Sequence, residues 1–313
     1  CELMNNSTQA SAKNIWLTID YTKEEELNRL IIKKIIIKDD GIGVHIDDLE
    51  RKILDIGTKN KEGGKGIGRF AAFQIGKNIE IETVGFSQGK KTYSKVYIPL
   101  SFDSFGNNIN VSKININTKE EILKDTNHNT YYQVTITNFY DDTVTNKEPK
   151  KKIIDKMLEK NICNSIFERY PLKIFNRDIK FHINNQLIDP NDFVIGKPTL
   201  KNISYKDRKE NEHNIKIRFF NIKNVDKQKV FLTTNNAGIQ TIASGFEFEA
   251  KWLSPKIGGW FIYVASDNLP SDLYRNIGLD GMDEEVKAFK LFIKEQLTIF
   301  FRQKNIEFTR WRN

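Results

Sequence analysis

The sequence predicts a two-domain α+β protein, in which an α/β sandwich is followed by a second α/β domain. A chain of 313 residues is long enough to bury two ordinary cores. In its first half, short apolar runs of strand length alternate with helical patterns. A lysine-dense stretch at residues 147–160, which as an alternative could be a solvated helix surface, comes before a second series of strands. We therefore expect domains at residues 1–146 and 147–313.

The order of elements in the first half follows from the spacing of its apolar residues. Helices are expected at residues 2–13, 45–56 and 69–75, and strands at residues 15–19, 31–38, 78–84, 92–99 and 131–138. Between Gly57 and Gly68 the chain is rich in Gly and Lys, which is typical of a mobile loop. This order predicts a sheet with helices on one face.

The second half carries further strand patterns and ends in an amphipathic helix. Strands are expected at residues 179–183, 215–222, 230–233 and 260–265. The final helix has one apolar stripe, which we expect to be core rather than a groove for a partner. The stripe consists of Val286, Phe289, Ile293, Leu297 and Phe300.

Composition argues against several classes of protein. The chain has no run of 18 or more apolar residues, so no membrane span is expected. Cys1 and Cys163 are too few for a disulfide framework and lack the paired spacing of a zinc site. A cytoplasmic protein without a membrane partner is the expectation. The net charge of +8 permits nucleic-acid contact, but lysines spread over a solvated surface would give the same total.

Two glycine-rich stretches superficially resemble common nucleotide motifs. Residues 85–92 have three residues between their glycines instead of the four of a P-loop, and Lys91 stands where Ser or Thr should hold magnesium. We expect a β-turn there. Residues 64–68 follow a loop rather than a strand and misplace the third glycine of a dinucleotide fingerprint.

Three other pieces carry chemistry. Glu2 and Asn6 lie one helical turn apart, where a carboxylate can polarise water and an amide oxygen can bind a hard cation. Asp39 ends an apolar strand, where it can accept a hydrogen bond from an adenine amino group, and Gly41 and Gly43 let the backbone pass close to the base. Each piece alone has an ordinary structural explanation, as a solvated helix face or a turn.

The third piece is Gly63-Gly64-Lys65-Gly66-Ile67-Gly68-Arg69-Phe70-Ala71. It offers consecutive backbone N–H groups and a helix N-terminus, and both suit phosphate.

In this order and with these gaps, the three pieces resemble the GHKL superfamily of gyrase, heat-shock-90 chaperones, histidine kinases and MutL. The resemblance implies a Bergerat-type sandwich that binds ATP and Mg²⁺ and forms a homodimer on ATP binding. It makes Glu2 the general base, Asn6 the magnesium ligand and Asp39 the adenine reader, in a turn completed by Gly41 and Gly43. The phosphates would be wrapped by Gly66, Ile67 and Gly68, with Lys65 and Arg69 either adding charge there or lying solvated in the lid.

Other features refine the resemblance. The family's Gly-Thr pair on a late strand is absent, because the matching strand begins Tyr131-Tyr132. Since the chain opens one residue before Glu2, inside the first motif, we expect a preceding segment to be missing.

The second half resembles the S5-like transducer domain of the MutL, gyrase, chaperone and microrchidia (MORC) branch. Residues 183–190 look like the strand–turn–strand found early in such domains, and the compact lid looks most like MORC-type and related bacterial ATPases. Transducers supply a basic residue to the γ-phosphate. Lys256 and Arg275 are candidates for this role, although either could be a surface charge.

The resemblance implies a slow ATPase whose nucleotide state drives a conformational change or dimer clamping that is relayed to a protein partner or to nucleic acid. Two alternatives stay open. One is a nucleotide-gated DNA-binding clamp with incidental turnover, and the other is a chaperone like heat-shock-90.

Overall fold

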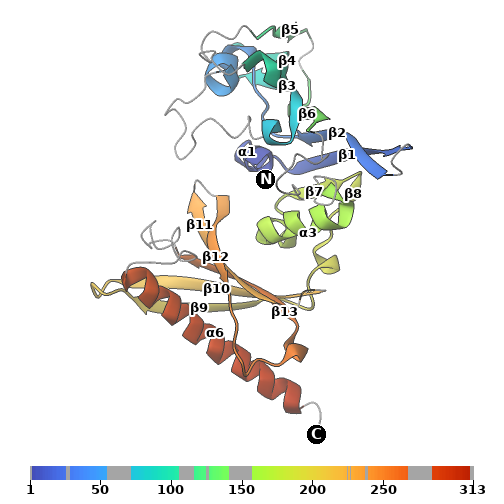
Figure 1. The fold of residues 1–313 in the computed structure, drawn as a ribbon. Coiled ribbons are helices and arrows are strands. Elements are labelled where there is room, and N and C mark those ends of the chain that lie inside the picture. The colour runs from blue at the N-terminus through green and yellow to red at the C-terminus, as the bar shows by residue number, and fades with distance from the viewer. Residues whose placement is uncertain are drawn as a thin grey trace. The chain divides into compact units, whose positions relative to one another are not determined.

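The fold was obtained as a computed structural model (Figure 1). The structure describes residues 2–25, 29–54, 72–105, 116–124, 127–140, 157–223, 225, 227–236, 239–266 and 284–310. The chain divides into two compact units, Cys1–Ile188 and Asp189–Asn313, and each has its own sheet. The domain boundary expected between residues 146 and 147 lies outside the described residues.

The first unit is built on an eight-stranded sheet in the order β5-β4-β3-β6-β2-β1-β7-β8. Its strands are β1 (Asn14–Glu24), β2 (Arg29–Asp39), β3 (Gly76–Ser87), β4 (Thr92–Ser101), β5 (Lys119–Leu123), β6 (Tyr131–Phe139), β7 (Lys180–Ile183) and β8 (Gln186–Leu187). Neighbouring strands are antiparallel, except that β1 and β7 are parallel. The five strands predicted for the first half are confirmed, and each is longer than predicted.

Short helices accompany this sheet. They are α1 (Glu2–Gln9), the 3-10 turns η1 (Ile46–Asp48) and η4 (Phe102–Phe105), the π-helical turn η2 (Glu50–Leu54), α3 (Glu159–Arg169) and α4 (Pro171–Phe175). Helix α1 ends earlier than residue 13 because Ser11 adopts a left-handed φ of 59°. Of the helix expected at residues 69–75, residues 72–74 form a 3-10 turn and residues 69–71 lie outside the described residues.

The single α-helix predicted over residues 45–56 is wrong. Leu49 and Ile53 are buried as the apolar period requires, yet the hydrogen bonds change from 3-10 to π-helical between η1 and η2. The N–H of Asp48 bonds to the carbonyl of His45 at 2.9 Å, which tightens the first turn. Val44 and Ile46 donate backbone hydrogen bonds to Thr83 on β3 and Ser94 on β4, and these contacts fix the start of the segment in a non-helical path.

The strand–turn–strand predicted near residue 183 is present as the β7–β8 hairpin. Asn184 and Asn185 have φ values of 45° and 70°, the left-handed pair that a tight hairpin requires. The Asn184 side chain also accepts a hydrogen bond from the N–H of Ile19 at 2.8 Å. This hairpin therefore extends the sheet of the first unit, whereas it was expected to lie early in the second domain.

The second unit consists of a five-stranded sheet in the order β12-β11-β13-β10-β9 and one long helix. Its elements are β9 (Thr199–Lys206), β10 (Glu212–Ile222), β11 (Gln228–Asn236), β12 (Ile239–Glu247), β13 (Gly259–Ser266), the 3-10 turns η6 (Pro190–Asp192) and η7 (Pro255–Ile257), and α6 (Glu284–Arg310). The apolar stripe predicted for the final helix is confirmed as core, since all five of its residues are buried against the sheet. The ring of Phe300 stacks on that of Phe219 at 3.8 Å between centroids. No helix among the described residues is long and apolar enough to cross a membrane.

Candidate functional site

Asp39 is the centre of the candidate site. It is the last residue of β2 and is only 2% exposed. The Ser7 hydroxyl donates a hydrogen bond to its Oδ2 at 2.6 Å, and the N–H of Gly41 donates to its Oδ1 at 2.9 Å. Because a carboxylate has about four acceptor positions, the side chain is fixed in orientation and can still accept from a bound molecule.

Burial raises the pKa of Asp39 above the ordinary value of 3.8, and the negative charge of Asp40 acts in the same direction. The hydrogen bonds from Ser7 and Gly41 oppose this rise without cancelling it. The ionised carboxylate is thus less well solvated than in water, so a further N–H donor would stabilise it.

The neighbouring carboxylate of Asp40 has a different environment. Its Oδ1 accepts hydrogen bonds from the N–H groups of Lys13 and Asn14 at 2.7 and 2.8 Å, and its Oδ2 accepts from the Asn14 amide at 2.7 Å. Partial burial works to raise the pKa of Asp40, but these hydrogen bonds outweigh it and lower the pKa. Asp40 therefore connects the end of β2 to the start of β1 by hydrogen bonds. Because its oxygens are used in these contacts, Asp39 is the better placed of the two carboxylates to bind a ligand.

The glycines after Asp39 are required by close backbone contacts. A Cβ at Gly41 would lie 2.7 Å from the carbonyl oxygen of Ala10, at the end of α1. Gly43 has a left-handed φ of 61°, and a Cβ there would lie 1.9 Å from the carbonyl oxygen of Val84. The tight approaches are therefore to the protein's own backbone, which holds this turn between α1 and β3.

Helix α1 carries two predicted site residues, Asn6 and Glu2, in addition to Ser7. Asn6 is half-buried, and its side chain makes no hydrogen bond to the described residues. An unpaired amide oxygen of this kind fits a magnesium ion, which binds oxygen ligands and keeps several waters or phosphate oxygens. Glu2 is the first residue of α1, one turn before Asn6, but its side chain lies outside the described residues. Among the side chains that the structure describes, no group of three or more His, Cys, Asp or Glu residues could hold a metal ion.

The predicted lid residues, Lys65, Gly66, Ile67, Gly68 and Arg69, lie outside the described residues, and so does Arg275. Lys256 is described and exposed, in the turn η7 of the second unit.

Two buried hydroxyl residues near the turn at Asp39 were not predicted from the sequence. Ser7 directly follows Asn6, but only the fold places its hydroxyl on Asp39. Thr83 is fully buried on β3, where its hydroxyl accepts a hydrogen bond from the N–H of Val44 at 2.9 Å and donates to the carbonyl of Tyr131 at 2.8 Å. The sequence does contain a clue to Thr83, because it is a polar residue that continues the alternation of the buried Ile79 and Ile81 along β3.

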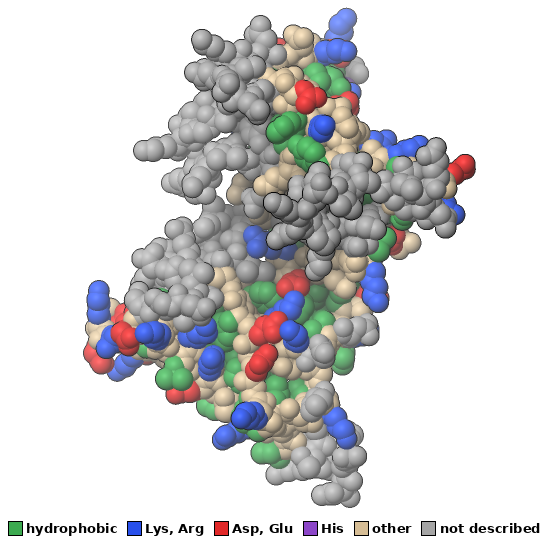
Figure 2. All heavy atoms as spheres, in the orientation of Figure 1, with side chains coloured by type: hydrophobic (Ala, Val, Ile, Leu, Met, Phe, Trp, Pro, Cys, Tyr) green, Lys and Arg blue, Asp and Glu red, His purple; other side chains and the backbone are tan. Residues whose placement is uncertain are grey.

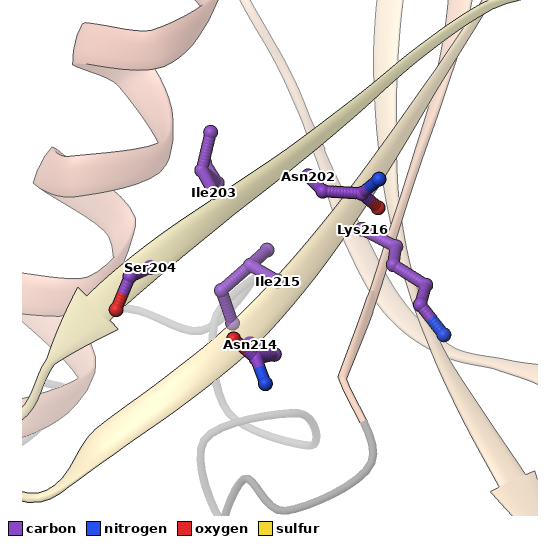
Figure 3. A pocket seen from close by; sticks show the side chains of 6 residues that line it. All are labelled: Asn202, Ile203, Ser204, Asn214, Ile215 and Lys216. Atoms are coloured by element: carbon purple, nitrogen blue, oxygen red, sulfur yellow. The ribbon is translucent and has the colours of Figure 1, made fainter.

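An open pocket of about 390 Å³ lies on β9 and β10 in the second unit (Figure 3). Its lining consists of Asn202, Ile203, Ser204, Asn214, Ile215 and Lys216. The Ser204 hydroxyl donates to Glu212 at 2.6 Å. Lys216 is the one ionisable side chain among these lining residues, and none of the predicted site residues is among them.

Residues 1–130 match the family described as histidine kinase-, DNA gyrase B- and HSP90-like ATPases. The matched range contains α1, Asp39 and the glycine-rich stretch. No curated protein shows significant similarity to the sequence.

Among the solved structures that are similar to the chain, three align over most of its length at low sequence identity. The N-terminal domain of a DNA repair protein aligns with a TM-score of 0.52 and 12% identity, covering 97% of this chain and 93% of that one. The ATPase domain of the mismatch repair endonuclease MutL from Aquifex aeolicus gives a TM-score of 0.45 and 14% identity, with coverages of 93% and 94%. The B-subunit of DNA gyrase from Myxococcus xanthus gives 0.41 and 8%, with coverages of 96% and 86%. The first likeness shows a shared fold.

Proposed function

Because residues 1–130 belong to the GHKL family of histidine kinase-, gyrase B- and HSP90-like ATPases, we propose that the first unit binds ATP with Mg²⁺ and hydrolyses it slowly. The observation that carries this proposal is the buried Asp39 carboxylate, fixed by Ser7 and Gly41. An adenine amino group donating to it would supply the further N–H donor that the poorly solvated carboxylate lacks.

Helix α1 would join the two ends of the nucleotide site. Ser7 holds the adenine-reading carboxylate, and Asn6, the next residue, would bind Mg²⁺ through its amide oxygen. Glu2, one turn earlier, would orient and deprotonate the attacking water. Mg²⁺, when bound, would neutralise charge on the phosphate oxygens. Catalysis in such a site consists of positioning and charge neutralisation, which agrees with slow turnover.

The glycine-rich stretch would complete the site. Backbone N–H groups of Gly66, Ile67 and Gly68 would bind the phosphates, with Lys65 and Arg69 adding positive charge. Support for this part comes from the sequence motif and from the family match, which includes these residues.

We further propose that ATP binding closes a homodimer and that the second unit relays this change to a partner. Lys256 or Arg275 would contact the γ-phosphate. A nucleotide-gated clamp on nucleic acid, with incidental turnover, is the alternative favoured by the net charge of +8. On the face drawn in Figure 2, basic side chains of the second unit are interspersed with acidic ones, so the positive charge is not gathered there in one patch. Nucleic-acid affinity that falls log-linearly with salt would support the alternative, whereas no binding at about 50 mM salt would exclude it.

Calorimetric titration with ATP and Mg²⁺ tests the proposal. Asp39→Asn keeps the shape of the side chain but removes the charged acceptor, so it should weaken binding by about 1.5–3 kcal/mol. Asp20→Asn is the matched control, because Asp20 lies on β1 and makes only a half-exposed ion pair with Lys34. ATP binding by Asp39→Asn equal to that of the wild type would show that the adenine assignment is wrong.

A further inference from the structure

Residues 43–48 leave the turn that follows Asp39, which we call the Asp39 turn. They cross strands β3 and β4 without joining the sheet, and we name them the crossing segment. Two of its N–H groups, two residues apart, bond to side-chain hydroxyls instead of to a neighbouring strand. The N–H of Val44 donates to Thr83 at 2.9 Å, and the N–H of Ile46 donates to Ser94 at 2.8 Å. Thr83 and Ser94 are both fully buried. Each hydroxyl thus satisfies a backbone donor that would otherwise lack a partner.

Gly85 lets the crossing segment lie directly on the sheet. A Cβ at Gly85 would come within 2.2 Å of the backbone nitrogen of His45. Gly85 pairs with Ser94 across β3 and β4, so the two residues lie side by side where they contact the crossing segment. On the face of β3 and β4 that the crossing segment covers, the buried side chains are otherwise apolar. Where the segment crosses, this face carries Thr83, Gly85 and Ser94 instead. Its apolar members are Ile79, Ile81, Val96, Ile98 and Leu100.

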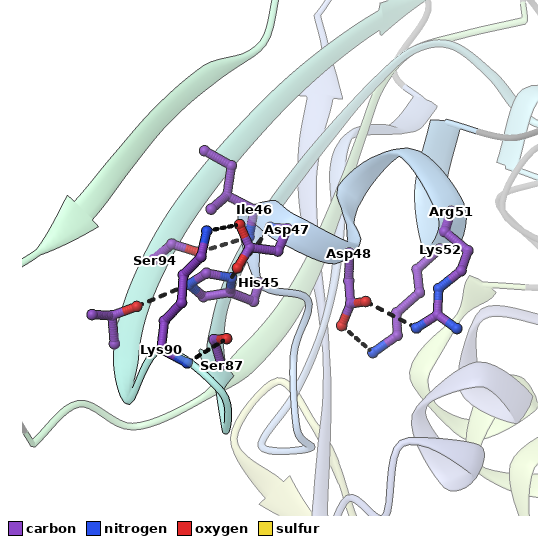
Figure 4. A network of polar contacts seen from close by, with 10 residues as sticks. His45, Ile46, Asp47, Asp48, Arg51, Lys52, Ser87, Lys90 and Ser94 are labelled. Atoms are coloured by element: carbon purple, nitrogen blue, oxygen red, sulfur yellow. Dashed lines mark hydrogen bonds and ion pairs between the residues drawn. The ribbon is translucent and has the colours of Figure 1, made fainter.

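A second set of contacts holds the far end of the crossing segment (Figure 4). The Nδ1 of the buried His45 accepts a hydrogen bond from the N–H of Asp47 at 3.2 Å, and its Nε2 lies 3.4 Å from the Thr92 hydroxyl. The Asp47 carboxylate accepts from Lys90 at 2.7 Å. Thr92 and Lys90 belong to the β3–β4 hairpin, which is the turn expected at residues 85–92.

We propose that Thr83 and Ser94 are positioning residues of the nucleotide site. They hold the crossing segment, which connects the Asp39 turn to the chain that leads to the glycine-rich stretch. Thr83 has the central place, because its hydroxyl also donates to the carbonyl of Tyr131, and the next residue, Tyr132, pairs with Asp39 across β2 and β6. This inference rests on the proposed function, since it assigns a role in ATP binding to residues that do not touch ATP.

Replacing Thr83 by valine keeps its volume and removes the hydroxyl. The N–H of Val44 and the carbonyl of Tyr131 would then be buried without this partner, and a shift of the crossing segment is the way to relieve this. Displacement of the Asp39 turn should weaken ATP binding by about tenfold. Thr83→Ser keeps both hydrogen bonds, so it should bind ATP nearly as well as the wild type. Ser94→Ala should weaken binding severalfold.

The experiment measures ATP affinity by calorimetry and the exchange of the Val44 and Ile46 amide protons in the nucleotide-free protein. Thr135→Val is the matched control, because Thr135 is a buried threonine on the adjacent strand β6 whose hydroxyl bonds to none of the described residues. Weak binding and fast Val44 exchange in Thr83→Val, with both normal in Thr83→Ser and Thr135→Val, support the proposal.

The other outcomes separate the inference from the proposed function. If the wild type binds ATP and Thr83→Val binds it equally well, the inference is wrong and the proposed function stands. If the wild type fails to bind ATP, the proposed function is wrong and the inference falls with it. Should Thr83→Val fail to fold, Ser94→Ala decides by the same measurements, with Ile46 as the reporting amide.

Discussion

Ser7 on helix α1 donates a 2.6 Å hydrogen bond to Asp39 at the end of β2, and both side chains are buried. The same hydroxyl lies 3.3 Å from the carbonyl of Leu3, one turn back in the helix. Ser7 is therefore a direct link between the helix that carries Glu2 and Asn6 and the carboxylate proposed to read adenine. The N–H of Ile42 adds a second link, because it donates a hydrogen bond to the carbonyl of Ala10 at 3.1 Å.

Ser7→Ala should weaken ATP binding by about tenfold, because one orienting hydrogen bond to a buried charge is lost. It should also raise the pKa of Asp39 further, since the Ser7 hydroxyl lowers it. Calorimetric titration against Ser165→Ala checks this. Ser165 is a suitable control because its hydroxyl likewise bonds to a carbonyl one turn back, at Asn161, on helix α3. Equal ATP affinities of the two variants would show that Ser7 does not contribute to ATP binding.

ATP affinity should fall as the pH is lowered through the raised pKa of Asp39. A carboxyl whose pKa is raised on folding favours the folded state below its unfolded pKa, and that contribution is lost as the pH rises through the folded pKa. ATP binding has the opposite pH dependence. The adenine amino group donates to the ionised carboxylate, so ATP should bind most tightly above the pKa that Asp39 has in the folded protein.

Titrations between about pH 7 and about pH 4.5 would measure this effect, with circular dichroism as the check that the fold persists. The fall should be centred above the ordinary value of 3.8. Asp20→Asn should show the same pH profile as the wild type. A flat profile in the wild type would indicate that Asp39 does not bind the nucleotide.

The strands that the sequence failed to predict have a shared physical cause. β5, β9 and β12 are all edge strands of their sheets. An edge strand is less enclosed than a central one and carries more polar residues, so its apolar alternation is weak. β5 reads Lys-Glu-Glu-Ile-Leu, and four of its five side chains are exposed. The central strands, such as β2 and β13, are predicted because they are covered by neighbours and rich in Ile, Val and aromatic residues.

At the candidate site, only the turn at Asp39 could be predicted from the sequence. Asp39 and its glycines are neighbours in sequence, and their pattern pointed to a tight turn at a strand end. Ser7, Thr83 and Ser94 act through contacts with residues far away in the chain, so no local spacing marks their roles. A polar residue in an apolar strand row was the available clue for Thr83 and Ser94.

Asp207 should stabilise the second unit in a pH-dependent manner. Hydrogen bonds from the Asn211 and His213 side chains outweigh desolvation and lower the pKa of Asp207 well below its usual range. A depressed pKa contributes stability that is present above the unfolded pKa and is lost as the pH falls toward the folded one. Asp207→Asn should therefore lower the midpoint of thermal unfolding at neutral pH, and less so in acid. Asp192→Asn, at the exposed turn η6, is the control and should change it little at either pH.

Glu2 and Asn6 should separate turnover from binding. If Glu2 orients the attacking water, Glu2→Gln should bind ATP like the wild type and release phosphate at least about a hundredfold more slowly, which is the lower range for loss of a general base. If Asn6 holds Mg²⁺, Asn6→Ala should lose the part of ATP affinity that depends on Mg²⁺, and its residual binding should be unchanged by a chelator. Calorimetry with and without Mg²⁺, together with phosphate release, distinguishes the two roles. Asn5→Ala is the neighbouring control, because the Asn5 side chain accepts a hydrogen bond from Tyr170 at 2.6 Å and is occupied there. If Glu2→Gln turns over ATP at the wild-type rate, the base must be sought elsewhere, while the assignment of Asp39 to adenine would be unaffected.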